Sequence, residues 1–297
     1  MKTTRRQWLA GGGALAGALA VNPKPARAAE AATKPPLRLS LAAYSFRDLL
    51  PRGEKKGTMT LHDLLDRCPD WGLDAFEPTS YYFSSEEPAY LHSLKARAFR
   101  LGIEISGTAV GNNFCLPEGD DRAREMAEMK RWIGNAVEIG APVIRIFAGR
   151  EDKKTDRATA FDRAVAGMRE ACDYAGSRGV FLAIENHGYL TETADDVLRI
   201  LDTVNHEWLG VNLDTGNFHG DPYANMAQLA PKALNVQVKA AVNVDGKKGE
   251  ADFARIAGIL RGAGYRGYVA LEYEEDADPL TAVPPMLGKL RAALQSV

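Results

Sequence analysis

The sequence predicts an α/β protein built as a (β/α)₈ TIM barrel, in a single domain that follows a cleaved N-terminal signal. Short apolar β-forming runs alternate eight times with segments of helical periodicity, and no low-complexity stretch interrupts them. About 270 residues follow the signal, which is enough for one such barrel. The competing fold, a doubly wound open sheet, normally has a glycine-rich turn after its first strand, and residues 42–46 contain no glycine.

Residues 1–28 are predicted to be a twin-arginine export signal. Arg5 and Arg6 precede the uncharged run 10–21, and residues 26–28 have the small-residue pattern of a cleavage site. The run is shorter and richer in glycine than a bilayer span, which needs about 20 strongly apolar residues, so a membrane anchor is the weaker alternative. We therefore expect a periplasmic or otherwise exported protein without membrane contact after cleavage, with a linker over 29–36 and the barrel over 37–297.

The net charge and the cysteine content argue against some classes of ligand and of structural site. Removal of residues 1–28 takes away five basic residues and leaves 32 basic against 39 acidic ones, a formal charge of −7. This balance disfavours nucleic acid as the main ligand, including for an endonuclease of a related metal-dependent type. The three cysteines have neither the density of a disulfide framework nor the spacing of a metal site. The sequence leaves a homo-oligomer open.

The first four strand and helix units are separated by glycines that are typical of helix C-termini. Gly72, Gly102, Gly140 and Gly179 each follow a segment of helical periodicity. The predicted strands are 37–43, 73–77, 103–110 and 142–147, and the predicted helices are 61–71, 88–101, 120–139 and 156–177.

The last four units follow the same alternation. Thr193 stands directly before an apolar-periodic segment, where it can serve as a helix N-cap. The predicted strands are 180–184, 209–214, 234–240 and 268–273, and the predicted helices are 193–204, 223–229, 252–263 and 280–294.

Polar side chains stand at the carboxyl ends of the last four strands. Glu185, Asp214, Gln237 and Glu272 come from successive strands, and the carboxyl ends of barrel strands are where ligands bind. Three carboxylates gathered there repel one another unless a positive charge lies between them. A divalent cation provides that charge, and an oxygen-rich set of ligands favours Mn²⁺ or Mg²⁺ over Zn²⁺.

Each of these residues taken alone has a plainer interpretation. A single acid at a strand end is usually a helix cap or a salt-bridge partner, and Gln237 alone would be a hydrogen-bonded core residue. Their coincidence on four successive strands favours the metal site.

The four strand ends lie in the strings Ile184-Glu-Asn-His187, Leu213-Asp-Thr-Gly-Asn217, Val236-Gln-Val-Lys239 and Leu271-Glu-Tyr-Glu274. These strings resemble the xylose-isomerase-like sugar isomerase/epimerase superfamily, which includes ketose 3-epimerases, inosose dehydratases and hydroxypyruvate isomerases. The resemblance covers nearly all of the chain after the signal.

The resemblance implies that Glu185, Asp214, Gln237 and Glu272 bind the metal and that Glu185 and Glu272 also act as the acid/base pair. One position departs from the pattern. The epimerases usually have histidine as the third ligand, in a His-x-Lys pattern, where this chain has Gln237 and Lys239. An amide oxygen is a weaker metal donor than imidazole.

These groups predict an exported, metal-dependent isomerase or epimerase that acts on a keto-sugar. A bound cation polarises the carbonyl, one glutamate removes the neighbouring proton to give an enediolate, and the other returns a proton. If a leaving group lies beta to the carbanion, the same intermediate eliminates it. A lyase acting on 3-keto-glycosides and a sugar-binding barrel without catalysis are therefore the alternatives.

Further residues are candidates for substrate binding. Arg145 stands out because a charge flanked by apolar β-formers should face the mouth of the barrel. Lys239 and His187 can hold substrate oxygens, although a histidine bonded to a backbone carbonyl is an equal alternative for His187. The complete set of predicted substrate-binding residues is His187, Lys239, Arg145, Glu77, Asn217 and Tyr44.

Overall fold

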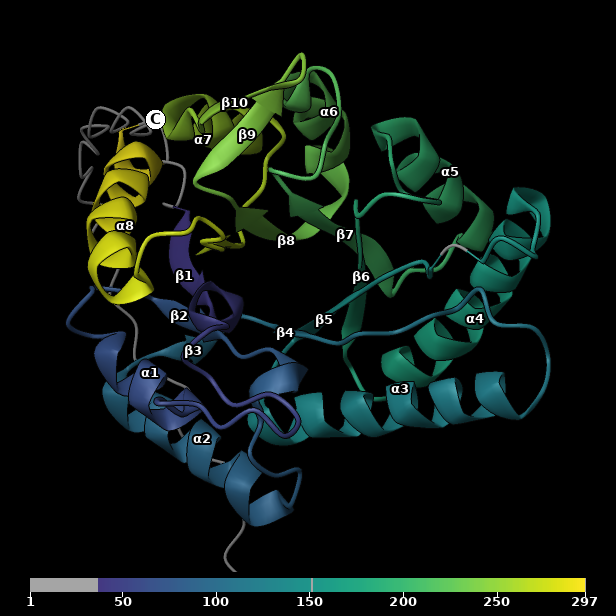
Figure 1. Cartoon of the computed structure of the whole chain (residues 1–297), viewed down its shortest axis with the longest axis horizontal. Helices are drawn as coiled ribbons and strands as arrows, with labels where there is room; N and C mark the ends of the chain where they lie inside the picture. The colour runs from purple at the N-terminus through teal and green to yellow at the C-terminus, as the bar shows by residue number, and fades with distance from the viewer. Residues whose placement is uncertain (1–36, 151, 297) are drawn as a thin grey trace, which may run out of the picture. The chain divides into compact units, whose positions relative to one another are not determined.

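The computed structural model of the chain describes residues 37–150 and 152–296. The predicted signal at 1–28 and linker at 29–36 lie outside the described residues. The described part forms a parallel β-barrel surrounded by helices (Figure 1), so the predicted TIM-barrel fold is confirmed. Within the described ranges, no helix is long and apolar enough to cross a membrane.

The barrel strands pair in the order β3-β2-β1-β11-β8-β7-β6-β5-β4, and all of these pairings are parallel. Parallel neighbours that are consecutive along the chain are what helical crossovers produce. The strands are β1 (Arg38–Ala42), β2 (Ala75–Glu77), β3 (Glu104–Ile105), β4 (Thr108–Ala109), β5 (Val143–Ile146), β6 (Phe181–Glu185), β7 (Leu209–Asp214), β8 (Ala233–Val238) and β11 (Tyr268–Leu271).

The two ends of this order, β3 and β4, are halves of one barrel strand, and they close the barrel. β3 pairs with β2 and β4 pairs with β5. Ser106, between the halves, still donates its backbone N–H to the Phe76 carbonyl at 3.0 Å. The single strand predicted over 103–110 is thus interrupted at 106–107. At Gly107 the chain passes so close to β5 that a Cβ would lie 3.0 Å from Val143 Cγ1.

Eight helices surround the barrel in the described ranges, and each contacts the next along the chain. Thr60 and Thr193 begin α1 and α5 with reciprocal side-chain and backbone hydrogen bonds, so the predicted N-cap at Thr193 is confirmed. α1 ends at Arg67 rather than Trp71, because Pro69 has no backbone N–H with which to continue the helical hydrogen bonds. The helices are α1 (Leu61–Arg67), α2 (Pro88–Leu101), α3 (Asp120–Ile139), α4 (Arg157–Ser177), α5 (Ala194–Val204), α6 (Pro222–Leu229), α7 (Phe253–Gly262) and α8 (Pro279–Gln295), with short 3₁₀ turns at Ala43–Phe46, Ser80–Tyr82 and Ala230–Lys232.

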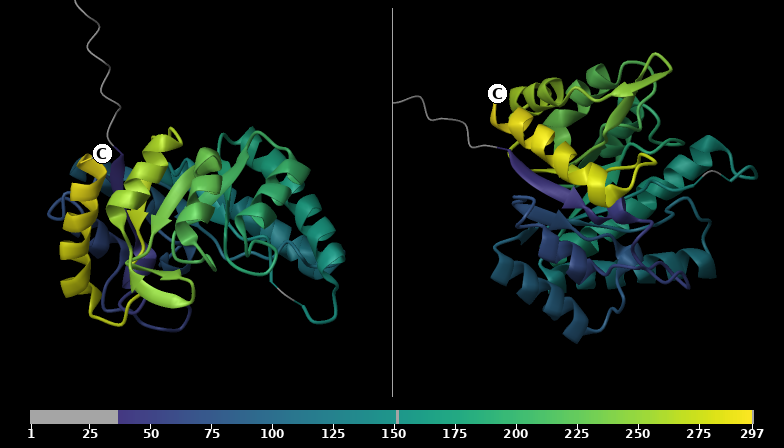
Figure 2. Two further views of the ribbon diagram at one scale, coloured as in Figure 1. Left: turned by 90° about the horizontal axis from the view of Figure 1, so that it is seen from above. Right: turned by 60° about the vertical axis from the view of Figure 1, so that its left-hand side comes forward.

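A β-hairpin that the sequence analysis did not predict follows β8. Its strands, β9 (Ala241–Val244) and β10 (Lys247–Glu250), are antiparallel, and the hairpin projects from the barrel (Figure 2). Asp245 and Gly246 form the turn with φ values of +50° and +77°, the positive φ that a two-residue hairpin loop requires. This Asp-Gly pair was the signal in the sequence. Lys248 pairs with Glu275 at 2.6 Å and so ties the hairpin to the loop after β11.

Polar side chains fill part of the barrel interior, where branched apolar residues are the usual filling. Glu77 accepts hydrogen bonds from Asn235 Nδ2 and Gln237 Nε2, both at 2.6 Å. Asn212 connects the same two amides, accepting from Asn235 at 2.8 Å and donating to Gln237 Oε1 at 2.7 Å. The four buried side chains therefore satisfy one another below the mouth of the barrel.

Candidate active site

A cavity of about 150 Å³ opens at the carboxyl ends of the strands. Its lining is mostly polar and includes two buried glutamates and two buried cations. The lining residues are Tyr44, Arg52, Tyr81, Arg145, Phe147, Glu185, His187, Asn217, Lys239, Glu272 and Glu274.

Glu185 ends β6 and faces this cavity with both carboxylate oxygens in contact with partners. Oε2 lies 2.9 Å from Arg145 Nε, and Oε1 accepts a hydrogen bond of 2.9 Å from Asn217 Nδ2. Burial raises the pKa of Glu185, and the attraction of Arg145 opposes that rise while the charge of Glu272 adds to it. Arg145 itself is fixed by donating to the Val110 carbonyl at 2.8 Å.

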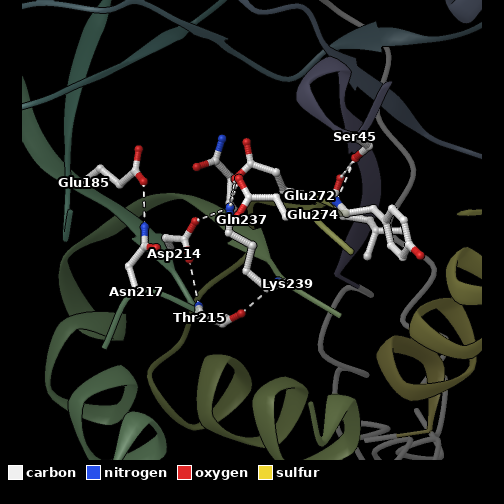
Figure 3. A network of polar contacts seen from close by, with 12 residues as sticks. Ser45, Glu185, Asp214, Thr215, Asn217, Gln237, Lys239, Glu272 and Glu274 are labelled. Atoms are coloured by element: carbon white, nitrogen blue, oxygen red, sulfur yellow. Dashed lines mark hydrogen bonds and ion pairs between the residues drawn. The ribbon is translucent and has the colours of Figure 1, made fainter. Parts of the chain in front are cut away.

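Lys239 follows β8 and directs its ammonium group among three carboxylates (Figure 3). Nζ lies 3.1 Å from Asp214 Oδ2 and 3.0 Å from Glu274 Oε1, and it donates a hydrogen bond to Glu272 Oε2. Burial would lower the pKa of Lys239, but attraction to these acids outweighs it and raises the pKa well above the ordinary value. The side chain is therefore a charged ammonium at neutral pH.

Glu272 and Asp214 differ in how this ammonium affects them. Burial would raise the pKa of Glu272, yet Lys239 lowers it below the ordinary value. For Asp214, which is completely buried, burial and the charges of Glu185 and Glu272 outweigh Lys239 and raise the pKa. Two carboxyl groups that contact the same ammonium group therefore have pKa values shifted in opposite directions, that of Glu272 downward and that of Asp214 upward.

Two positioning residues were missed by the sequence analysis. Asn186 accepts from the Asp214 backbone N–H and donates to the Asp214 carbonyl, both at 2.9 Å, which fixes the end of β7. Ser45 donates to the Leu271 carbonyl at 3.2 Å and accepts from the Tyr273 N–H at 2.9 Å, so it fixes the backbone on both sides of Glu272. Asn186 stood inside one of the four family-like strings, whereas no local pattern distinguished Ser45.

Three of the predicted site residues do not line the cavity. Gln237 and Glu77 belong to the buried network with Asn212 and Asn235, and Asp214 is completely buried beside Lys239. Burial raises the pKa of Glu77 to about 6, and the charge of Glu272 adds to this rise.

The other predicted residues lie at the cavity wall. His187 is exposed, and its ring centroid is 4.7 Å from that of Phe147. Tyr44 and Asn217 line the opening. Glu274 and Arg52, which the prediction did not include, line it as well. Glu272 and Glu274 follow the end of β11, and the two-residue spacing between them was the signal for Glu274 in the sequence.

The four predicted metal ligands do not fit a shared divalent cation in this arrangement. Lys239 Nζ already lies where Asp214 and Glu272 converge. The Gln237 oxygen accepts from Asn212, and Glu185 is engaged by Arg145 and Asn217. Across the part of the chain that the structure describes, no group of three or more His, Cys, Asp and Glu side chains is arranged to hold a metal ion.

Comparison with known proteins identifies the family. A family model described as xylose isomerase-like TIM barrel matches residues 65–293. No curated protein matches the chain. Among solved structures, D-psicose 3-epimerase from Clostridium cellulolyticum H10 has a TM-score of 0.70 at 18% identity, over 87% of this chain and 97% of that one.

Two further structures have the same fold. The 3-keto-D-glucoside 4-epimerase from E. coli has a TM-score of 0.70 at 15% identity, over 86% of this chain and 99% of that one. A xylose isomerase-like TIM barrel protein from Mycobacterium smegmatis, solved in complex with magnesium, has a TM-score of 0.68 at 18% identity, over 88% and 97%. A closed barrel with polar strand ends and a family match over most of its length together show that this chain belongs to the xylose isomerase-like TIM-barrel family.

Proposed function

We propose that this protein is an enzyme that moves a proton at the carbon next to a carbohydrate carbonyl, as a sugar isomerase or epimerase. One observation carries the proposal: Glu185 and Glu272 face the same cavity, and each is contacted by a buried cation, Arg145 or Lys239. Enolate chemistry needs groups that remove and return a proton, which two carboxyl groups can do, and a positive charge that stabilises the enolate oxygen. The similar structures include two sugar epimerases, which supports the same class of substrate.

The residues suggest a short reaction sequence. One glutamate removes the proton from the carbon, and the electron pair left behind moves onto the carbonyl oxygen to give an enediolate. Lys239 and Arg145 lie beside the cavity as hydrogen-bond donors for that oxygen. The second glutamate returns a proton, to the opposite face for epimerisation or to the neighbouring carbon for isomerisation, in which the hydroxyl proton of that carbon passes to the former carbonyl oxygen.

Solvent exchange tests the proposal. The purified protein would be incubated with a panel of keto-sugars in D₂O, and deuterium at the carbon next to the carbonyl would be followed by NMR. We expect Glu185→Gln and Glu272→Gln each to lower the exchange rate by about a hundredfold or more. Glu250→Gln is the matched control, because Glu250 is exposed at the end of β10 and pairs with Lys289 at 2.7 Å, outside the cavity.

Two results would count against this function. Absence of exchange with every sugar, or exchange that survives both substitutions at the wild-type rate, contradicts it. A barrel that only binds sugar predicts that Glu272→Gln leaves ligand affinity intact and that the wild type shows no turnover.

A lyase is the second candidate, and one observation favours it. A neighbouring cavity of about 280 Å³ shares His187 and Asn217 with the first and extends past Phe218 and His219 to Asn243. This space suits a group attached to the sugar. A 3-keto-glycoside bound across both cavities would lose its aglycone from the same enediolate, so release of the aglycone in the exchange assay distinguishes the lyase from the epimerase.

We also propose that the protein is exported. The motif Arg5-Arg6 and the uncharged run after it support this location. Replacing both arginines with lysine should retain the protein in the cytoplasm, which cell fractionation would show. Dependence on Mn²⁺ or Mg²⁺ is the expectation that the family resemblance adds, and exchange in the presence of a chelator decides it.

A further inference from the structure

We propose that the ammonium group of Lys239 replaces the divalent cation of related barrels, so that this enzyme holds its own fixed positive charge and works without a bound metal. The part that concerns catalysis rests on the proposed function. The part that concerns metal binding does not, because it follows from the contacts of Lys239 alone.

The position of Lys239 is the first observation. Its Nζ lies 3.1 Å from Asp214 Oδ2, donates to Glu272 Oε2, and lies 3.0 Å from Glu274 Oε1 (Figure 3). A divalent cation bound by Asp214 and Glu272 would need the same volume. Two cations held that close in a buried site repel strongly, so the ammonium and the metal exclude each other.

The commitments of the other two predicted ligands are the second observation. Gln237 uses its oxygen for Asn212 and its amide N–H for Glu77. Glu185 pairs with Arg145. Thus two cations of the chain itself, Arg145 and Lys239, lie against the carboxylates that a metal would contact.

The space made for the lysine is the third observation. A Cβ on Gly216 would lie 2.4 Å from Lys239 Cγ and 3.0 Å from its Cβ, and Gly216 does not have a positive φ. Glycine is therefore required there for room and not for backbone conformation. The Lys239 N–H also donates to Thr215 Oγ1 at 2.9 Å. The loop after Asp214 is built to let this side chain pass.

The contacts also indicate where substrate binds. Asp214 and Glu272 are buried beside the ammonium group, whereas the Glu274 side chain is 39% exposed at the cavity opening. A substrate carbonyl oxygen that displaces Glu274 would accept an N–H of Lys239. When a glutamate takes the proton from carbon, the negative charge that moves onto this oxygen is stabilised by the ammonium, and no external electron acceptor is needed.

Direct Mn²⁺ binding tests the replacement without reference to turnover. Full-length protein treated with a chelator and dialysed would be titrated with Mn²⁺, and the free ion would be followed by electron paramagnetic resonance. We expect the wild type to have no Mn²⁺ site that depends on Asp214, so Asp214→Asn should leave Mn²⁺ binding unchanged. Lys239→Met, which keeps length and loses charge, should bind Mn²⁺ at least about tenfold more tightly, a change within the range of substitutions next to metal ligands.

Controls keep the outcomes distinct. Lys248→Met removes an exposed lysine that pairs with Glu275 and should behave as the wild type. If the wild type binds one Mn²⁺ per chain and Asp214→Asn abolishes that binding, the replacement is wrong, and this conclusion does not depend on whether Lys239→Met folds.

The exchange assay separates this inference from the proposed function. Exchange by the wild type in the presence of a chelator, lost in Lys239→Met, supports both. Exchange that appears only after Mn²⁺ or Mg²⁺ is added overturns the replacement and leaves the proposed function standing. No exchange under any condition refutes the proposed function, while the Mn²⁺ titration still decides which cation the site holds.

Discussion

Glu77 is a carboxyl group that the barrel buries completely, and two amides donate to it. Its pKa is raised to about 6, chiefly by burial. A glutamate that is harder to ionise in the folded state than in the unfolded state lowers stability at high pH. This effect is absent below the unfolded pKa, grows between the unfolded and the folded pKa, and is complete above the folded pKa.

We therefore predict that Glu77→Gln gains stability relative to the wild type as the pH is raised from 5 to 8. A shift of this size corresponds to about 2 kcal/mol in the free energy of unfolding in total, of which about 1 kcal/mol develops between pH 5 and pH 8. Urea unfolding of both proteins gives the difference between their free energies of unfolding at pH 5 and at pH 8. Any effect of the substitution that does not depend on pH cancels when the two differences are compared. Glu250→Gln controls for pH effects common to surface acids. A difference between Glu77→Gln and wild type that stays the same at pH 5 and 8 contradicts the prediction.

Gly216→Ala should displace Lys239 by contact alone. The added methyl group would overlap the Lys239 side chain, and overpacking of this kind costs about 1 to 3 kcal/mol. We expect a lower rate of solvent exchange together with a lower free energy of unfolding, measured on the same preparation. Gly288→Ala is the control, because that glycine is exposed within α8 with open space around it and should stabilise by about 0.5 to 1 kcal/mol. Full activity in Gly216→Ala would show that the site does not depend on this passage.

At the scale of helices and strands, a strong local sequence pattern correctly predicted the N-cap of α5. Thr193 caps α5, accepting from the Asp196 N–H at 3.1 Å, while Asp196 accepts from the Thr193 hydroxyl at 3.0 Å. The Asp-Gly turn of the hairpin was as strong a signal, yet its short strands lie inside a stretch that is mostly polar. The break in the third barrel strand had no local signal, because it depends on how closely β5 approaches Gly107.

Removing the cap of α5 gives a prediction for this element. Thr193→Ala should lower the free energy of unfolding by about 1 kcal/mol, since the first turn of the helix loses its side-chain acceptor. Thr193→Ser keeps a hydroxyl and should retain most of the stability. Urea unfolding of the three proteins measures both differences, and an alanine variant as stable as the serine variant would refute the role of the cap.

At the scale of the whole barrel, buried charges from separate strands pair with one another. Arg145 pairs with Glu185, and Lys239 pairs with Asp214 and Glu272. Removal of only one member of such a pair strongly destabilises the protein, because the other charge remains buried without a partner. The stability of the barrel and the chemistry of its mouth therefore depend on the same contacts.

This balance predicts how stability responds to metal removal. A chelator should leave the melting temperature of the wild type unchanged, because Lys239 supplies the charge between Asp214 and Glu272. In Lys239→Met, Mn²⁺ should raise the melting temperature, since binding to the folded state alone stabilises by about 2.7 kcal/mol at a hundredfold excess over the dissociation constant. Differential scanning calorimetry measures both shifts, and a wild type that loses stability on chelation contradicts the charge balance.

The order of strands and helices, and the strand ends that meet at the mouth, could be predicted from sequence because periodicity and strand alternation are local properties. That is why Glu185, Asp214 and Glu272 were found together. Which groups touch within the mouth is a different matter, since it depends on side chains that are far apart in the chain. Tertiary structure alone decided that Lys239 lies between the acids, that Gln237 donates to Glu77, and that Gly216 leaves room for the lysine. These contacts depend on packing distances between strands, and a local sequence pattern does not determine such distances.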